Sequence, residues 1–202
     1  MADLESVADL ALVESRIAEG TRLALVINNA GFAARGLVAA LDPDRLTAML
    51  RLNVLALSRL SHAAMKRMVA ERAGAIINVA SGTAFMQVPG NAGYGASKSY
   101  VTAFTRHMQA EAVGTGVAVQ LLVPGVVATE FHSIADTSIE RYPPHIIMQP
   151  NDVVAASLNA LDRGEPVCIP SLGDVGLWEE WTKAEAGLAA NVSRDTPAVR
   201  YR

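Results

Sequence analysis

The sequence predicts an α/β protein with a parallel sheet and helices on both of its faces. Short apolar runs alternate along the chain with helical patterns, and each run ends in a turn rich in glycine, proline or asparagine. Strands separated by helices pair in parallel through right-handed crossovers, which gives one half of a doubly wound sheet. At 202 residues the chain is long enough to bury a core of its own.

The first half of the chain predicts two helices and a strand. Residues 4–19 have helical periodicity, and residues 23–27 (LALVI) form the continuous apolar run of a strand that is buried on both faces. A long helix begins where Asp42 can cap and Pro43 takes the first helical position. It runs toward Gly74, and a break within it remains an alternative.

The second half repeats the alternation of strand and helix. Residues 75–80 (AIINVA) predict the next strand, a helix covers 94–113, and residues 117–123 (VAVQLLV) predict a third strand. Residues 150–164 begin with a proline and end in a glycine, as a helix does, and residues 166–170 (PVCIP) form a last short strand. We expect one domain over residues 1–202, of which residues 191–202 are a flexible tail.

Composition excludes several classes of function. A net charge of -3 and a pI near 5.8 argue against a nucleic-acid partner, which needs a clustered basic face. One cysteine, Cys168, excludes an internal disulfide and indicates a reducing compartment, so we expect a cytoplasmic protein. No signal peptide and no run of 18 apolar residues is present, so no membrane span is expected. The four histidines lack metal-ligand spacing, and we expect no metal site.

Each predicted strand ends in an unusual turn. The first ends in INNAG (27–31), the second in NVASG (78–82) and the third in VPGVVATEF (123–131). In a doubly wound sheet, ligands bind at the carboxyl ends of the strands. A plain turn is the more frequent explanation for any one of these segments taken singly, but together they indicate a binding site.

Tyr94 and Lys98 are the candidate catalytic pair. A spacing of four places both side chains on one face of a helix. The pKa of a free tyrosine is about 10, and a nearby ammonium should lower it toward the working range of an acid-base catalyst. Ser81, at a strand end, could hydrogen-bond the same reacting oxygen. The alternative is an ordinary contact on the surface of a helix, with a serine beside it.

Asn53 is an independent candidate. Leu46, Leu50, Asn53 and Leu57 form one stripe at helical spacing, so an amide falls on an apolar face. A buried amide needs hydrogen-bond partners. The alternative is a core asparagine that is satisfied by a neighbouring turn.

These residues together resemble the short-chain dehydrogenase/reductase family. NNAG at 28–31, Asn53, Ser81, Tyr94-x-x-x-Lys98 and PGVVAT at 124–129 follow the order and spacing of the family, and the resemblance covers most of the chain. It implies a Rossmann-like fold and hydride transfer between NAD or NADP, with NADP preferred, and a small alcohol or carbonyl substrate. It also implies a homodimer or homotetramer that forms through the helices of Asn53 and Tyr94.

The resemblance also implies roles for the residues. Tyr94 would be the general acid/base, Lys98 would modify its pKa and bind the nicotinamide ribose, Ser81 would orient the carbonyl oxygen, and Asn53 would hold a water molecule of a proton relay. The residues implied to contact the cofactor are Asp3, Asn29, Ala30, Gly31, Tyr94, Lys98, Pro124, Gly125, Val127 and Thr129. The segment 130–150, with Phe131, His132, Tyr142 and Met148, resembles the loop that covers the substrate.

The sequence departs from the family at its N-terminal end. No G-x-G-x-x-G motif is present, although the family binds pyrophosphate with such a turn, and residues 2–4 (ADL) resemble a segment that follows the family's third strand. We therefore expect the N-terminal βαβαβ portion to be missing, through a truncated reading frame or a real loss. The strand at 23–27 would then be an exposed edge.

Three functions follow from the sequence. We expect that the complete protein is a nicotinamide-dependent oxidoreductase. One alternative is a catalytically inactive remnant of such an enzyme that cannot hold the dinucleotide. The other alternative is an interaction protein that pairs with a partner through its exposed edge strand.

Overall fold

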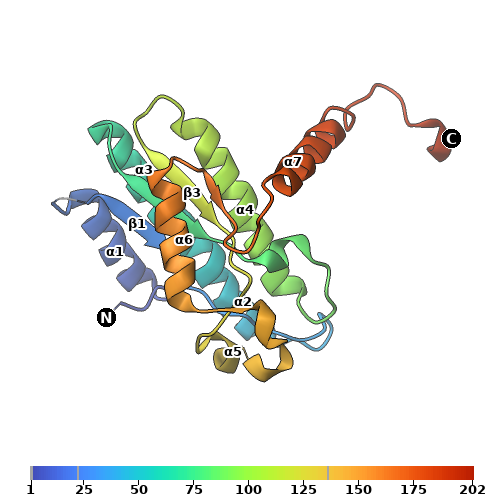
Figure 1. Cartoon of the computed structure of the whole chain (residues 1–202), viewed down its shortest axis with the longest axis horizontal. Helices are drawn as coiled ribbons and strands as arrows, with labels where there is room; N and C mark the ends of the chain where they lie inside the picture. The colour runs from blue at the N-terminus through green and yellow to red at the C-terminus, as the bar shows by residue number, and fades with distance from the viewer. Residues whose placement is uncertain (1, 22, 136) are drawn as a thin grey trace. The chain divides into compact units, whose positions relative to one another are not determined.

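The computed structural model describes residues 2–21, 23–135 and 137–202, and it contains the predicted parallel sheet (Figure 1). The strand order is β1-β2-β3-β6, and all neighbours are parallel. The strands are β1 (Leu25–Asn28), β2 (Ala75–Val79), β3 (Ala118–Leu122) and β6 (Val167–Cys168). All four predicted strands are confirmed, with ends that differ by at most two residues.

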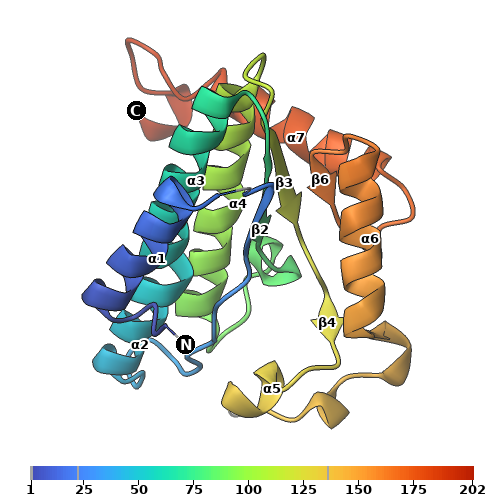
Figure 2. The same ribbon diagram turned by 90° about the vertical axis from the view of Figure 1, so that its left-hand side faces the viewer.

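Helices cover both faces of the sheet, as predicted (Figure 2). One face carries α1 (Val7–Glu19), α3 (Leu57–Glu71) and α4 (Ala92–Ala112), and the other carries α6 (Pro150–Asp162). Because successive residues of a strand point to opposite faces, Ile76 packs in the cluster beneath α1, α3 and α4, whereas Ile77 packs in the cluster beneath α6. β2 and β3 are therefore buried on both sides, whereas β1 is not buried on both faces as expected, because Ile27 of this edge strand is 52% exposed.

The long predicted helix is broken at its centre. It consists of α2 (Pro43–Leu50), a π-helical turn η1 (Arg51–Ala56) and α3, and the Asp42 carboxylate caps it by accepting a hydrogen bond from the Asp44 backbone N–H at 2.9 Å. The extra residue of a π turn shifts the faces of the helix that follows it. Leu50, which ends α2 before this turn, is 39% exposed, so its expected place on the buried stripe is wrong, whereas Asn53 within the turn is 1% exposed.

Short elements connect the strand ends. The two-residue strands β4 and β5 pair in parallel, and this pair closes the base of the loop between them. The loop falls within the segment that resembles a substrate-covering loop. The short elements are η2 (Gly82–Phe85), β4 (Val126–Val127), α5 (Phe131–Ile134), η3 (Ile139–Arg141), η4 (Pro144–Ile146) and β5 (Ile147–Met148).

The chain divides into two compact units, Met1–Pro170 and Ser171–Arg202. The first unit holds the whole sheet and the elements described above. The second holds α7 (Gly176–Ala189) and η5 (Val199–Tyr201), and two tryptophan rings on α7 contact each other with their centroids 4.9 Å apart. The expectation of one domain over residues 1–202 with a flexible tail at residues 191–202 remains a prediction.

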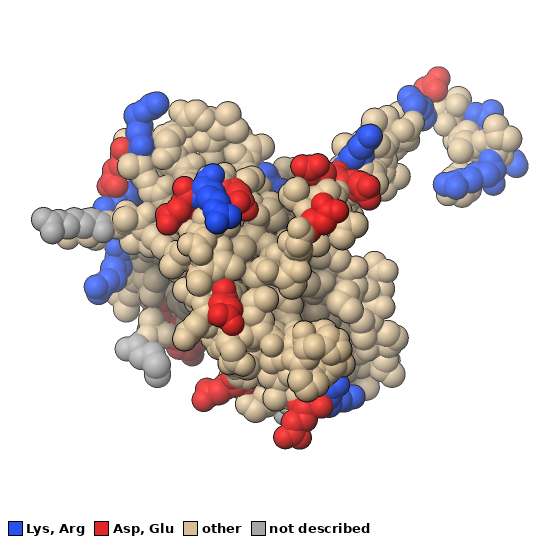
Figure 3. All heavy atoms as spheres, viewed as in Figure 1, with Lys and Arg blue, Asp and Glu red and all other residues tan. Residues whose placement is uncertain are grey.

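The surface has no single dominant charge on the face that Figure 3 shows, where basic and acidic side chains are interspersed among uncharged ones. Among the described residues, no helix is long and apolar enough to cross a bilayer. Within the same ranges, no three side chains of His, Cys, Asp or Glu come together as they would around a metal ion.

Candidate active site

The ends of three strands lie at one edge of the sheet. Because β1, β2 and β3 are parallel and in register, the turns that follow them leave the sheet on the same side. Two backbone hydrogen bonds extend the ladder past β2 and β3: Ala80 N–H donates to Leu122 O at 2.8 Å, and Gly82 N–H donates to Pro124 O at 2.9 Å. Ser81 is thus held beside the Pro-Gly turn.

Helix α4 brings Tyr94 and Lys98 to this edge. The Lys98 ammonium donates to the backbone carbonyl of Val79, the last residue of β2, with an Nζ–O distance of 2.8 Å. The same nitrogen lies 5.9 Å from the centroid of the Tyr94 ring, and the two residues are 5% and 6% exposed. The Ser81 side chain lies close enough to the Tyr94 phenol to lower its pKa. The structure therefore gathers three of the four predicted catalytic residues.

Burial governs the proton affinity of both groups. It raises the pKa of Tyr94 to about 12, against smaller lowering effects from Ser81 and from the Arg35 guanidinium. It also lowers the pKa of Lys98 to about 8. The expectation that Lys98 draws the pKa of Tyr94 downward is therefore wrong for this structure. Its physical reason is that desolvation favours the neutral form of both groups.

Asn53, in the π-helical turn η1, is a fully bonded core amide. Its side chain exchanges two hydrogen bonds with the backbone of Phe32, as donor at 2.9 Å and as acceptor at 3.1 Å. It also donates to Ser97 Oγ at 3.1 Å, and Ser97 in turn donates to the Tyr94 carbonyl at 2.7 Å. Asn53 therefore ties the segment after β1 to the turn of α4 that carries Tyr94.

Gly31 lies beside both the Asn53 amide and the Lys98 ammonium. A Cβ atom at this position would lie 2.8 Å from Asn53 Oδ1 and 3.7 Å from Lys98 Nζ. A side chain would thus fill the space in front of the ammonium. The neighbouring Asn29 and Ala30, which follow β1, are exposed.

The predicted cofactor residues after β3 lie along the same edge. Pro124 and Gly125 form the turn, and Val127 lies in β4, where its carbonyl is 3.1 Å from Nε2 of the His132 ring. Thr129 is exposed, and its hydroxyl accepts a hydrogen bond from the Phe131 backbone at 3.4 Å. All four residues therefore belong to the segment that leaves β3 beside Ser81.

Asp3, the predicted adenine contact, makes only local hydrogen bonds among the described residues. Its backbone N–H donates to Asp9 Oδ2 at 2.8 Å, and its carboxylate accepts from the Glu5 N–H at 3.0 Å. These bonds organise the turn before α1, and no described contact connects Asp3 to Tyr94 or Lys98.

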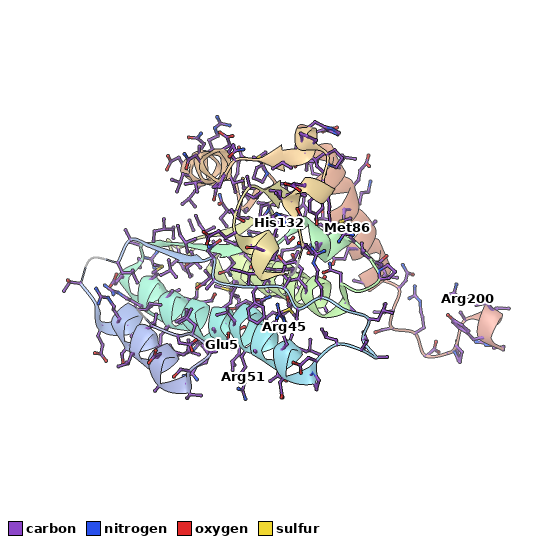
Figure 4. All side chains as sticks on the ribbon, turned by 90° about the horizontal axis from the view of Figure 1, so that it is seen from below. Glu5, Arg45, Arg51, Met86, His132 and Arg200 are labelled. Atoms are coloured by element: carbon purple, nitrogen blue, oxygen red, sulfur yellow. The ribbon has the colours of Figure 1, made fainter. Side chains whose placement is uncertain are left out.

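Aromatic side chains of the loop after β4 pack over Tyr94. The Phe131 ring lies 5.6 Å from that of Tyr94, and the His132 ring contacts both Phe131, at 5.9 Å, and Tyr142, at 5.5 Å. Arg45 of α2 donates to the Ile134 carbonyl at 2.9 Å. His132 and Arg45 are labelled in Figure 4. The loop residues singled out in the sequence thus include the neighbours of Tyr94.

Sequence reasoning missed several polar residues around the site. Ser97 stands inside the Tyr94–Lys98 motif, and its place three residues after Tyr94 could have indicated a bond back to that residue's carbonyl. Arg35 carries a cation whose charge acts on Tyr94, and a lone arginine in an apolar stretch gave no signal. A buried network of hydrogen bonds, 2.8–3.2 Å long, supports the sheet beneath the site; its members are Asn28, Ser61, Asn78 and Thr105.

The sequence is similar to proteins described as dehydrogenases, oxidoreductases and reductases. It matches the family model described as short chain dehydrogenase over residues 1–138. An uncharacterized oxidoreductase of Myxococcus xanthus is 28% identical over 158 residues, which are 78% of this chain and 60% of the relative. A 3-oxoacyl-(acyl-carrier-protein) reductase of Synechocystis is 30% identical over 119 residues, 59% of this chain and 48% of the relative. This chain therefore spans about half to three fifths of the length of these curated relatives.

Solved structures of the same fold cover the whole chain. A short-chain dehydrogenase from Sphingobium yanoikuyae in complex with NADPH is 34% identical with a TM-score of 0.94, and the match covers 100% of this chain and 78% of that one. A bulky-bulky ketone specific alcohol dehydrogenase from Comamonas testosteroni is 31% identical with a TM-score of 0.88, and covers 100% and 76%. With its parallel sheet and the family match over more than half of its length, the chain belongs to the short-chain dehydrogenase family of oxidoreductases.

Proposed function

We propose that the complete protein is an NAD(P)-dependent oxidoreductase that reduces a ketone or oxidises the corresponding secondary alcohol. The observation that supports this most strongly is the meeting of Ser81, Tyr94 and Lys98 at the carboxyl ends of the strands, braced by Asn53. Phenol, hydroxyl and ammonium groups in one buried place suit proton transfer to a carbonyl oxygen.

In this proposal Tyr94 gives its proton to the substrate oxygen. A pKa raised to about 12 keeps the phenol protonated at neutral pH, which is the form that a reduction requires. Ser81, whose side chain acts on the same phenol, holds the substrate oxygen in place. The bound nicotinamide supplies the hydride.

The residues present fit the nicotinamide end of such a cofactor. The Lys98 ammonium has three N–H donors, and only the carbonyl of Val79 accepts from it among the described residues. Its remaining donors suit the hydroxyls of a ribose. The missing Cβ of Gly31 leaves space in front of the ammonium. We propose NADP as the cofactor, which agrees with the NADPH bound to the Sphingobium relative.

We propose a bulky, uncharged ketone as the substrate class. The Comamonas relative is described as specific for bulky-bulky ketones. In this chain the Phe131 ring packs against Tyr94, the His132 ring against Phe131 and the Tyr142 ring against His132, an aromatic surface that suits an apolar substrate. Aromatic walls exclude water and bind apolar surface.

The test measures oxidation of NADPH and NADH by the full-length protein with ketones that carry a bulky group on each side. Tyr94→Phe removes the proton donor and should lower kcat by at least about a hundredfold. The matched control is Tyr100→Phe on the same helix, whose exposed hydroxyl contacts Ser58 instead of the site. A Tyr94→Phe enzyme with the turnover of the native protein would contradict the proposal.

The alternative interaction function has one observation in its favour. β1 pairs with β2 alone among the described residues, and Ile27 at its centre is 52% exposed. An open strand edge can pair with another chain. Turnover by the full-length protein that depends on Tyr94 would decide for the enzyme.

A further inference from the structure

A hollow of about 380 Å³ lies between the segment after Ser81 and the first turns of α4. Its apolar walls are Met86, Val88, Pro89 and Ala92, of which Met86 and Val88 are 57% and 47% exposed (Figure 4 labels Met86). The other lining residues are Gln87, Asn91, Gly95 and Ala96, so none of its lining side chains is ionisable. Its occupant should therefore be neutral and mostly apolar.

Asn91 is the unusual member of this lining. It is 8% exposed, and its Oδ1 atom is buried with no hydrogen-bond partner among the described residues. Asn91 stands at the N-cap of α4, where an asparagine normally accepts a hydrogen bond from the first turn, yet its side chain makes no such bond. The usual structural reason for an asparagine at this position is thus absent.

The segment after Ser81 packs closely against this turn of α4. Around the position of a Cβ on Gly95, the Thr83 backbone carbonyl would lie at 3.4 Å and the Asn91 side-chain nitrogen at 3.8 Å. Because buried polar groups are normally hydrogen-bonded, the unpartnered amide oxygen of Asn91 indicates an external partner.

The place of the hollow connects it to the reaction. Met86 follows Ser81 by five residues and Asn91 precedes Tyr94 by three, so each of the two lining segments adjoins a proposed catalytic group along the chain. A substrate that reaches Tyr94 with its carbonyl could extend along these walls.

We propose that Asn91 is a specificity-determining residue that binds a hydroxyl group of the substrate at a distance from the reacting carbonyl. A hydroxyl both donates and accepts, so it can satisfy either atom of the amide, whichever way the amide is turned. The substrate class is thereby a neutral, largely apolar ketone with a second, hydroxyl-bearing end. This inference rests on the proposed function, since it treats the hollow as part of the substrate site.

The experiment compares benzylacetone with its meta-hydroxy and para-hydroxy analogues on the full-length protein. Their affinities are measured by titration calorimetry in the presence of NADP⁺, and kcat/KM is measured with NADPH. At least one hydroxy analogue should bind about fivefold to tenfold more tightly than benzylacetone, as one added hydrogen bond implies. Equal affinities of all three ketones would overturn the proposal.

Variants assign the preference to Asn91. Asn91→Leu keeps the volume but removes the polar atoms, and Asn91→Ala serves as a second variant if the first folds poorly by circular dichroism. Both should reduce the ratio of affinities to within about twofold, because no hydrogen bond remains to distinguish the ketones. Asn159→Ala, at an exposed asparagine of α6, is the matched control and should keep the native ratio. A preference that survives in both Asn91 variants would assign the hydroxyl to another group and overturn the proposal.

Failure of the inference can be told apart from failure of the proposed function. Turnover with equal affinities leaves the reaction in place and removes the hydroxyl site. An affinity ratio that depends on Asn91, without any turnover, supports the hydroxyl site and contradicts the proposed reaction.

Discussion

At the scale of single residues, burial competes with charge pairing at the candidate site. Lys98 lies 5.9 Å from the Tyr94 ring, yet the pKa of Tyr94 rises, because desolvation outweighs the lowering effects that act on the phenol. The ammonium is itself destabilised in the same dry surroundings. The two groups therefore influence stability as well as chemistry, in directions that can be measured.

Lys98 should make stability depend on pH. Folding lowers its pKa from 10.5 to about 8, so between these values the unfolded chain binds more protons, and stability rises with pH. From about pH 7.5 to about pH 9.5, the free energy of unfolding of the native protein should rise by about 1–2 kcal/mol relative to that of Lys98→Met. Urea unfolding of both proteins across this range is the measurement.

The control for this prediction is Lys183→Met, at an exposed lysine of α7, which should follow the native protein at every pH. Tyr94 does not interfere, because its pKa is raised from 10.0 and its effect therefore begins only above that value. Parallel pH curves for the native and Lys98→Met proteins would contradict the assigned burial of the ammonium.

Gly31 should tolerate no side chain. In Gly31→Ala the new methyl group would lie 2.8 Å from Asn53 Oδ1, so the hydrogen bonds of Asn53 to Phe32 would have to shift. We expect a loss of about 1–3 kcal/mol in the free energy of unfolding, measured by denaturant titration. The matched control is Gly125→Ala, where no atom lies within 4 Å of the added carbon. Equal stability of the two variants would refute the close approach at Gly31.

At the scale of elements, the π-helical turn η1 decides which residues of a long helix face the site. It places Asn53 in the core, where the amide bonds to Phe32 and Ser97, and it leaves Leu55 49% exposed. The exposed Leu55 is therefore available for contact with a second subunit. Met68, Leu57 and Val101 lie in the core with at most 4% exposure, so they are not available for an interface.

We predict that the protein forms a dimer or tetramer through η1, α3 and α4. Leu55 lies one turn before Ser58, and Ser58 contacts the hydroxyl of Tyr100, which is 40% exposed on α4. Combining Leu55→Glu with Tyr100→Glu should yield a monomer, because like charges would face each other across the interface. Light scattering at micromolar concentration measures the mass.

The control for association is Leu12→Glu, which adds a charge at an exposed leucine of α1 and should keep the native mass. A native protein that is already monomeric in the same experiment would disprove the prediction.

At the scale of the whole molecule, the proposed dinucleotide site is represented at one end only. Lys98, Gly31 and Val127 are the residues that we propose for the nicotinamide and its ribose, whereas the 202 residues contain no G-x-G-x-x-G turn for a pyrophosphate. A few hydrogen bonds of about 0.5–1.5 kcal/mol each do not replace the electrostatic contribution of such a turn.

We therefore predict that the 202-residue chain by itself binds NADPH and NADH only weakly, with a Kd of roughly millimolar or higher. Isothermal titration with both cofactors is the measurement. The same titration of Lys98→Met is the comparison, and this variant should show no measurable binding of either cofactor. A micromolar Kd for the chain by itself would show that another segment, or a second copy, provides the phosphate site.

Much of the fold could be predicted because its signals are local. Apolar runs of strand length, the cap of Asp42 with Pro43, and the turns after each strand depend on neighbours in the chain, and they located four strands and the main helices correctly. The spacing of Tyr94 and Lys98 likewise places both residues on one helix turn beside the end of β2. For these features the sequence was sufficient.

Only the tertiary structure decided how the site behaves. Nothing local indicates that Leu50 is exposed, that Asn53 bonds to Phe32, or that the amide oxygen of Asn91 is left without a partner among the described residues. The pKa of Tyr94 moved against the sequence-based expectation for the same reason. Burial and long-range contacts arise when layers far apart in the chain pack together. The sequence by itself therefore determined the strands, the helices and the spacing of Tyr94 and Lys98, and packing determined the charge state and the partners of the site residues.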